Sequence, residues 1–242
     1  MFRIACSGKS DAGLRRPNNE DALAVDAGRG FLAVADGMGG AASGEVASQI
    51  FVDTTREIFS AYASESDEAV SALVQQSFLL ANERIFNLAK ENADRQGMGC
   101  TAELLAFHDG VYMLGHVGDS RTYLFRDGAL RQITKDHSLI QEQIDRGLMT
   151  PEEARSHALR NVIVRAVGVN EELAVDLIKG EGRPGDIFLL CSDGLPDMVA
   201  DYGIQELLSL PFGLDEKAEG LIEAAKAAGG HDNVTVALCE VL

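Results

Sequence analysis

Four aspartates lie beside apolar runs, where side chains of neighbouring strands can meet. Asp36 follows FLAVA, Asp119 follows HVG, Asp193 follows IFLLCS and Asp232 precedes VTVAL. Magnesium and manganese are hard cations that bind oxygen, through a few carboxylates and several water molecules. We therefore expect these four side chains to form a two-metal centre.

Glycine adjoins three of these aspartates, in Asp36-Gly37, Gly118-Asp119 and Asp193-Gly194. A residue without Cβ lets the backbone approach a ligand closely. An Asp-Gly pair at the end of a strand is also an ordinary turn, so no single pair establishes a site. The recurrence of the pattern favours the metal centre.

The segment before the first aspartate adds an arginine and two adjacent carboxylates, Arg16, Glu20 and Asp21. A guanidinium group can donate two parallel hydrogen bonds to phosphate oxygens. In isolation this segment could equally be a polar loop, and Arg15 is interpreted as a solvated neighbour. Beside a metal centre, Arg16 indicates phosphate chemistry.

The elements that must position these residues are strands and amphipathic helices. Runs of β-branched, aromatic and aliphatic residues predict strands at 31–35, 100–107, 111–117, 121–125, 187–191 and 234–241. The Asp-Gly pairs at 109–110 and 127–128 predict tight turns, which would make 100–133 an antiparallel meander of four short strands.

Two longer helices are predicted from apolar residues at helical spacing. The first, 45–61, would face the core with Val46, Ile50, Thr54 and Ile58; the second, 67–90, with Val70, Leu73, Val74, Ser77, Ala81, Ile85 and Leu88. Shorter helices are expected at 139–146, after Thr150 and at 215–228. Strands and helices do not alternate strictly, so the fold class is α+β.

Composition and charge exclude several classes of protein. The 242 residues contain no linker-like stretch and fit one domain. With 38 acidic and 21 basic residues the formal charge is −17, which disfavours nucleic acid and anionic membranes as partners. There is no apolar stretch of signal-peptide or membrane-span length. The four cysteines form no CxxC pair, and we expect reduced thiols in the cytoplasm.

Taken together, these residues resemble the PPM family, of the protein phosphatase 2C type, and in particular its compact bacterial members. The motifs are RPNNED (16–21), VADGMGG (34–40), GMGCTA (97–102), GHVGDSR (115–121), TKDHSL (134–139), RNVIVRAVG (160–168), LLCSDGL (189–195) and GGHDNVTV (229–236). The resemblance implies an α-β-β-α sandwich, with two antiparallel sheets flanked by helices and the metal centre at one edge. It also implies one catalytic domain, 1–242, with a mobile flap at about 135–169.

The resemblance assigns metal ligands. Asp36 would bridge two Mn²⁺ or Mg²⁺ ions, with Asp193 and Asp232 completing one site. Glu20 and the Gly37 carbonyl would hold the other ion. Asp21 would act through metal-bound water, and Asp119 would help to bind a weaker third ion.

The family pattern also assigns the catalytic roles. Arg16 would bind the phosphate, and Asp36, Asp193 and Arg16 are the residues on which catalysis depends. Eukaryotic members have a histidine where this chain has Met38. No histidine of this sequence can be assigned as the general acid, and a metal-bound water is the expected proton donor.

The implied activity is hydrolysis of phosphoserine and phosphothreonine in proteins, by direct attack of a water or hydroxide bridging the two metals. Two alternatives stay open: a metallohydrolase of small phosphoesters, and a catalytically silent module that binds phosphopeptides. The expected partners are phosphoproteins, with a bacterial Hanks-type kinase and a forkhead-associated scaffold or secretion-system component as hypotheses. We expect a monomer that binds neither nucleic acid nor membrane.

Overall fold

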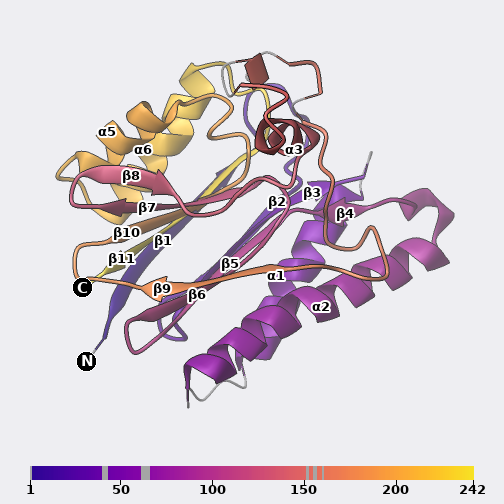
Figure 1. Ribbon diagram of the computed structural model, residues 1–242, viewed down its shortest axis with the longest axis horizontal. Helices are drawn as coiled ribbons and strands as arrows, with labels where there is room; N and C mark the ends of the chain where they lie inside the picture. Colours follow the sequence, from indigo (N-terminus) through magenta and orange to yellow (C-terminus); the bar gives the residue numbers. More distant parts are fainter. Residues whose placement is uncertain (1, 40–42, 61–65, 151–152, 155–156, 160) are drawn as a thin grey trace.

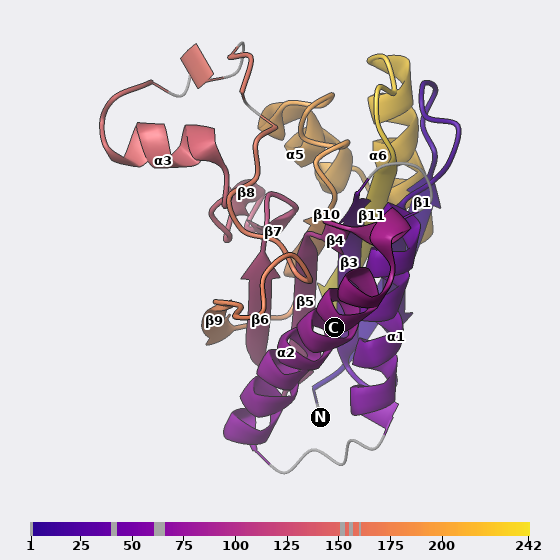
Figure 2. The ribbon, with the colours of Figure 1, turned by 90° about the vertical axis from the view of Figure 1, so that its right-hand side faces the viewer.

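In the computed structural model, two antiparallel sheets lie face to face and helices cover both outer faces (Figure 1). The structure describes residues 2–39, 43–60, 66–150, 153–154, 157–159 and 161–242. The order of layers is helix pair, sheet, sheet, helix pair, which the turned view also shows (Figure 2). The predicted α-β-β-α sandwich is therefore confirmed.

One sheet has the strand order β1-β11-β10-β7-β8. Its strands are β1 (Ile4–Asp11), β7 (Arg121–Arg126), β8 (Ala129–Gln132), β10 (Ile187–Cys191) and β11 (Val234–Val241). The helices α5 (Asp201–Ser209) and α6 (Leu214–Ala227) cover its outer face.

The other sheet has the order β2-β3-β5-β6-β9, and β4 pairs with the end of β3. Its strands are β2 (Asp21–Asp26), β3 (Phe31–Met38), β4 (Gly99–Cys100), β5 (Ala102–His108), β6 (Val111–Val117) and β9 (Asp176–Glu181). Outside it lie α1 (Gly44–Ser60) and α2 (Asp67–Glu91), and the short elements η1 (Ala93–Arg95) and α3 (Leu139–Asp145) complete the described chain.

Continuous apolar strands arise because the central strands are covered on both faces. In β3, Leu32 and Val34 contact the opposite sheet, where Phe188 and Leu190 of β10 lie, while the alternate residues of β3 face α1 and α2. Successive side chains of a strand point to opposite faces. A strand buried on both sides therefore needs an apolar residue at every position.

The two predicted Asp-Gly turns are confirmed, but the meander they were expected to build is wrong. Asp109 and Asp127 have φ of 43° and 52°, each followed by a glycine with positive φ, as two-residue hairpin turns require. β5 pairs with β6, and β7 with β8, yet the two hairpins belong to different sheets. The chain crosses from one sheet to the other between β6 and β7.

Three strands and one helix were not predicted. β1, β2 and β9 include polar or small residues at many positions, and the nine-residue helix α5 carries few apolar residues. The expected strand at 100–107 is also interrupted at Thr101, between β4 and β5. Such elements are stabilised by pairing and packing with neighbouring strands and layers, so the local sequence pattern alone predicts them poorly.

The first long helix was predicted at the correct place, but the prediction missed its most buried side. Thr54 is fully buried and Val46, Ile50 and Ile58 pack against the core while partly buried, whereas Ala47, Phe51 and Phe59, which were not predicted, are fully buried. The second helix follows the prediction, and its buried residues are Val70, Val74, Ser77, Phe78, Ala81, Asn82 and Ile85. The helices predicted at 139–146 and 215–228 correspond to α3 and α6.

Some predictions fall wholly or partly on residues that the structure does not describe. These are Gly40 of the second motif, the end of the first helix at 61, the helix start at 151–152 and Arg160 of the sixth motif. Among the described residues, no helix combines the length and the apolar character needed to cross a membrane.

Candidate metal centre

The predicted carboxylates converge at one end of the sandwich. Asp21 begins β2 and lies directly opposite Asp36 of β3 in the strand register. Asp193 follows β10 by two residues and Asp232 precedes β11 by two, and these strands are also paired. Asp119 stands at the crossing between β6 and β7. Tertiary folding thus brings together residues from five separate parts of the chain.

Two carboxylate oxygens at this end are buried without a partner. Among the described residues, Oδ1 of Asp21 and Oδ1 of Asp193 are the buried side-chain oxygen or nitrogen atoms that have no hydrogen-bond partner. The other oxygen of Asp21 accepts a 2.8 Å hydrogen bond from the Ser192 hydroxyl. Leaving a buried acceptor unpaired is costly, so such atoms are expected to have a ligand.

Burial and mutual repulsion raise the pKa values of these carboxyl groups. Burial, followed by the charges of Asp21, Asp193 and Asp119, raises the pKa of Asp36 well above its usual value. Burial and the charge of Asp119 do the same to the pKa of Asp193. Without a cation, the centre therefore favours partial protonation.

The two flanking carboxylates show the same effect more moderately. Burial raises the pKa of Asp21 to about 6, against the hydrogen bonds that favour its ionised form. Burial and the charge of Asp136 raise the pKa of Asp119 to about 7. A divalent cation would reverse these shifts because it stabilises the ionised carboxylates.

Glycines allow the loops of this end to approach one another. A Cβ on Gly37 would lie 2.1 Å from the Gly44 carbonyl oxygen and 2.6 Å from that of Glu20. A Cβ on Gly194 would lie 2.0 Å from the Asn233 carbonyl oxygen. Gly37 and Gly194 are thus required for close packing between loops, whereas approach of their backbone to a ligand stays a prediction.

Asn233 connects the loops around the carboxylates. Its side chain accepts a 2.8 Å hydrogen bond from the Glu20 amide and donates to the carbonyls of Ala12 and Asn18, at 3.1 and 2.8 Å. The residue is 5% exposed. Through these contacts the buried Asn233 side chain joins the segment around Glu20 to the loop that carries Asp232.

A further pair of hydroxyl residues had not been assigned a role from the sequence. The Thr101 amide donates to the Asp36 carbonyl at 2.9 Å, and the Thr101 hydroxyl is 2.6 Å from that of Ser120. Ser120 follows Asp119, so the pair links the loops of two predicted ligands. Both residues lie within motifs already noted; Ser120 directly follows Asp119 in the sequence, whereas the contact between Thr101 and Asp36 arises only from the fold.

Arg16 lies at the same end and contacts Asp232. Its guanidinium group donates to Oδ2 of Asp232 at 2.7 Å, and its side chain is 53% exposed. Met38 pairs with Gly99 at the end of β3. His116 of β6 hydrogen-bonds instead to Glu103, and His137, in the loop after β8, accepts from the Gly118 amide.

The residues at this end suit magnesium or manganese, which keep water ligands, better than a metal whose ligands all come from the protein. Within the described ranges, no three His, Cys, Asp or Glu side chains are arranged so that they could hold an ion on their own. Magnesium keeps several water ligands and needs only one or two carboxylates. The donors near the unpaired oxygens are carboxylates and carbonyls, which hard cations prefer.

A four-layer sandwich with mutually repelling carboxylates at one end defines this chain as an α-β-β-α protein with a centre suited to divalent cations. More specifically, the chain belongs to the protein phosphatase 2C family, whose model matches residues 14–219.

Two bacterial relatives illustrate the similarity. The chain is 44% identical over 237 residues to serine/threonine protein phosphatase PstP of Mycobacterium tuberculosis, covering 97% of this chain and 44% of the relative. It is 36% identical over 232 residues to protein phosphatase PhpP of Streptococcus pneumoniae, covering 95% and 94%. This chain thus spans less than half of the first relative and nearly all of the second.

Solved structures agree with the fold. The catalytic domain of PstP in complex with two manganese ions superimposes with a TM-score of 0.91 at 40% identity, covering 100% of both chains. PppA of Pseudomonas aeruginosa, described as a key regulatory component of T6SS, gives a TM-score of 0.90 at 33% identity, covering 99% and 98%.

Proposed function

We propose that this chain is a protein phosphatase that removes phosphate from phosphoserine and phosphothreonine with two Mn²⁺ or Mg²⁺ ions. The observation that carries the proposal is the pair of unpartnered buried oxygens, on Asp21 and Asp193, among carboxylates of raised pKa. Family membership and the two manganese ions of the PstP domain support it.

We propose the division of ligands that the family pattern implies. Asp36, Asp193 and Asp232, together with water molecules, would hold one ion, with Asp36 shared by the second. The Glu20 side chain and the Gly37 carbonyl would complete the second site, since Glu20 Oε2 and the Gly37 carbonyl oxygen both lie beside Gly44. Asp21 would act through a water molecule, and Asp119 would serve a weaker third ion.

When bound, the two cations would supply a hydroxide nucleophile at neutral pH. Arg16 would bind phosphate oxygens with its planar guanidinium group, and its exposure allows it to leave Asp232 for a substrate. Asn233 and Thr101 would hold the ligand loops in position through their hydrogen bonds. His116 and His137 are engaged elsewhere, which supports water as the proton donor to the leaving oxygen.

The segment 135–169 is proposed as a flap of the single domain 1–242. Its two ends are joined by hydrogen bonds from the Leu139 amide to the Val162 carbonyl and from the Val164 amide to the His137 carbonyl, at 2.8 and 2.9 Å. A segment closed at its base can present one surface to a substrate without disturbing the sheets.

The proposed substrates are phosphoproteins, and a Hanks-type kinase with its targets is the proposed partner system. A forkhead-associated scaffold or a secretion-system component is a further candidate, which the likeness to PppA supports. We propose a cytoplasmic monomer, since the four cysteines are unpaired thiols suited to a reducing compartment.

The proposal is tested by phosphate release from a phosphothreonine peptide by the purified chain, with manganese, with magnesium and with chelator. Metal-dependent release is expected. Small phosphorylated metabolites, assayed in parallel, should be poorer substrates; faster hydrolysis of these would favour a small-phosphoester hydrolase instead. Tight binding of the peptide without any release at saturating metal would identify a silent phosphopeptide-binding module.

A further inference from the structure

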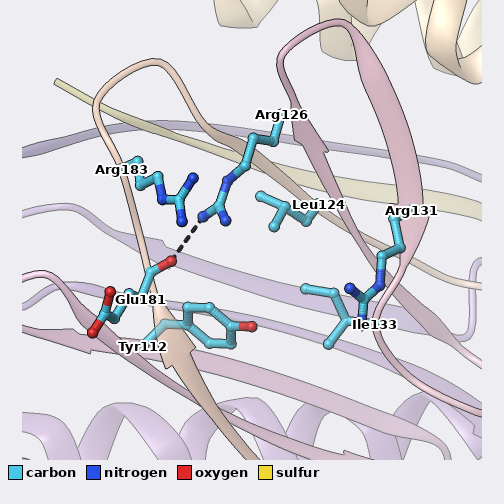
Figure 3. A pocket seen from close by; sticks show the side chains of 7 residues that line it. All are labelled: Tyr112, Leu124, Arg126, Arg131, Ile133, Glu181 and Arg183. Atoms are coloured by element: carbon cyan, nitrogen blue, oxygen red, sulfur yellow. Dashed lines mark hydrogen bonds between the residues drawn. The ribbon is translucent and has the colours of Figure 1, made fainter.

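A second polar pocket lies at the end of the sandwich away from the carboxylates. It opens between β8 and β9, the edge strands of the two sheets, and has a volume of about 290 Å³ (Figure 3). β7 runs from Arg121, near Asp119, to Arg126 at the pocket. At about 3.3 Å per residue, the pocket is about 20 Å from the carboxylates.

Three arginines surround this pocket, although the chain as a whole is strongly acidic. Arg126 is neutralised, because its guanidinium group donates to both carboxylate oxygens of Asp186 at 2.8 and 2.6 Å and to the Glu181 carbonyl. Arg131 and Arg183 are exposed, and neither guanidinium group bonds to any residue that the structure describes. The Glu181 carboxylate points away from them (Figure 3). Two positive charges are therefore left uncompensated.

Tyr112 supplies an unpartnered hydroxyl group in the pocket. The residue is 8% exposed, its ring packs against Phe188 at 5.0 Å, and its hydroxyl has no hydrogen-bond partner among the described residues. The ring lies over Gly180, where a Cβ would be 2.4 Å from the Tyr112 oxygen. A glycine at this position of β9 thus makes room for the phenol.

The pocket also has an apolar wall, formed by Leu124 and Ile133. Its volume is at the lower limit of small-molecule pockets, which suits a single side chain. β8 and β9 each have one unpaired edge, and an extended peptide can add to such an edge. Two uncompensated guanidinium groups match the charge of about −1.5 to −2 on a phosphorylated side chain.

We propose that this pocket binds a phosphorylated side chain carried by an extended segment of a protein partner. Arg131 and Arg183 would donate to its phosphate oxygens from the edges of different sheets, and Tyr112 would donate from within. Leu124 and Ile133 would contact the aliphatic stem. Glu181 is the carboxylate that lines the pocket, and no described residues form a cluster that could hold a metal, so the pocket would recognise the phosphoryl group without hydrolysing it, whether or not the proposed catalytic function is correct.

The test measures binding of a fluorescein-labelled phosphothreonine peptide by fluorescence anisotropy, with the full chain in chelator to prevent turnover. Arg131→Glu and Arg183→Glu should each weaken binding by about tenfold or more, because charge-assisted hydrogen bonds are lost. Arg3→Glu is the matched control, since Arg3 is an exposed arginine at the far edge of the same sheet as Arg131 and should bind like the parent.

Further measurements distinguish binding at this pocket from binding at the metal centre and test which chemical group the pocket recognises. The unphosphorylated peptide should bind far more weakly, and the losses caused by Arg131→Glu and Arg183→Glu should be the same on an Arg16→Ala background as in the parent. Unchanged binding by the double variant Arg131→Glu/Arg183→Glu, with its melting temperature preserved, would overturn the proposal. Equal binding of a peptide with glutamate in place of phosphothreonine would overturn the assignment of a phosphoryl group.

Discussion

Two regions of this sandwich differ in how fully their buried carboxylates are provided with partners. Glu103 is fully buried, but its oxygens bond to His116 and, at 2.5 Å, to the Thr122 hydroxyl. His116 in turn contacts the Lys135 carbonyl at 2.9 Å. At the end of the sheets, Asp21 and Asp193 each keep a buried oxygen without any such contact.

The difference separates a structural use of buried charge from a functional one. Burial alone would lower the pKa of His116, but the adjacent Glu103 carboxylate raises it above its ordinary value, so the pair is stabilised internally. At the metal centre the neighbours of Asp36 are other carboxylates, which repel it. Removing a carboxylate should therefore have opposite effects on stability in the two regions.

The largest effect is expected from Asp36→Asn or Asp193→Asn. Activity towards a phosphothreonine peptide should fall by about a thousandfold or more, because metal ligation contributes several kcal/mol and each 1.36 kcal/mol is tenfold. In chelator the same variants should be more stable than the parent in urea, since a repelling charge is removed. A variant with activity close to that of the parent, or with reduced stability in chelator, would contradict the comparison.

Glu103→Ala should have the opposite effect on stability. Removing one partner of a buried pair leaves His116 uncompensated and should lower the free energy of unfolding by about 3–5 kcal/mol. Unfolding in urea in the presence of chelator measures this free energy. Glu206→Ala, an exposed change in α5, is the control and should stay within about 0.5 kcal/mol of the parent. If Glu103→Ala were as stable as the parent, the buried pair would not be a stabilising element.

The pH dependence of cation binding sharpens the same contrast. The raised pKa values of Asp21 and Asp119, about 6 and about 7, mean that the metal-free fold binds protons more tightly than the unfolded chain. Its stability is therefore fully present below the unfolded pKa and falls as pH rises through about 6 to 7, by about 3 kcal/mol for Asp21 alone.

Manganese should reverse this loss, because it replaces the protons with a cation. The increase in melting temperature on adding manganese should be larger at about pH 8 than at about pH 5. Thermal unfolding with and without chelator at both pH values measures the difference. An equal increase at both would show that protons and manganese do not compete for these oxygens.

The smallest effect is expected from Arg16, which lies beside the metal centre. Arg16→Ala should raise KM by about tenfold, with a smaller fall in kcat, because a charge-assisted contact with phosphate is lost. Steady-state kinetics with the phosphothreonine peptide measures both constants. Arg15→Ala, at the exposed neighbouring position, should behave like the parent. Similar losses in both variants would point to a general charge effect in place of a specific contact.

Structural features that depend on a few neighbouring residues could be predicted from the sequence alone. Asp-Gly turns need two residues of positive φ, and the predicted turns at 109–110 and 127–128 are present. The face of α2 follows from its spacing. The motif aspartates were also identified in advance, because a carboxylate next to a strand and a glycine is visible without knowledge of its neighbours.

Tertiary structure decided what depends on contacts between distant segments. The sequence fits two arrangements of the hairpins β5–β6 and β7–β8 equally well, either one continuous meander or two separate sheets. Packing between the layers places the two hairpins in different sheets. The core-facing side of α1 likewise depends on which residues meet β3.

The sequence by itself determined the chemical groups, the tight turns and the order of motifs, since these depend on residue type and short-range geometry. Only the folded chain decided which carboxylates are paired, as Glu103 is, and which are left with unsatisfied oxygens, as Asp21 and Asp193 are. It also placed Arg131 and Arg183, from different sheets, around one pocket. The physical reason is that burial and electrostatic partners arise from long-range packing, which no local pattern encodes.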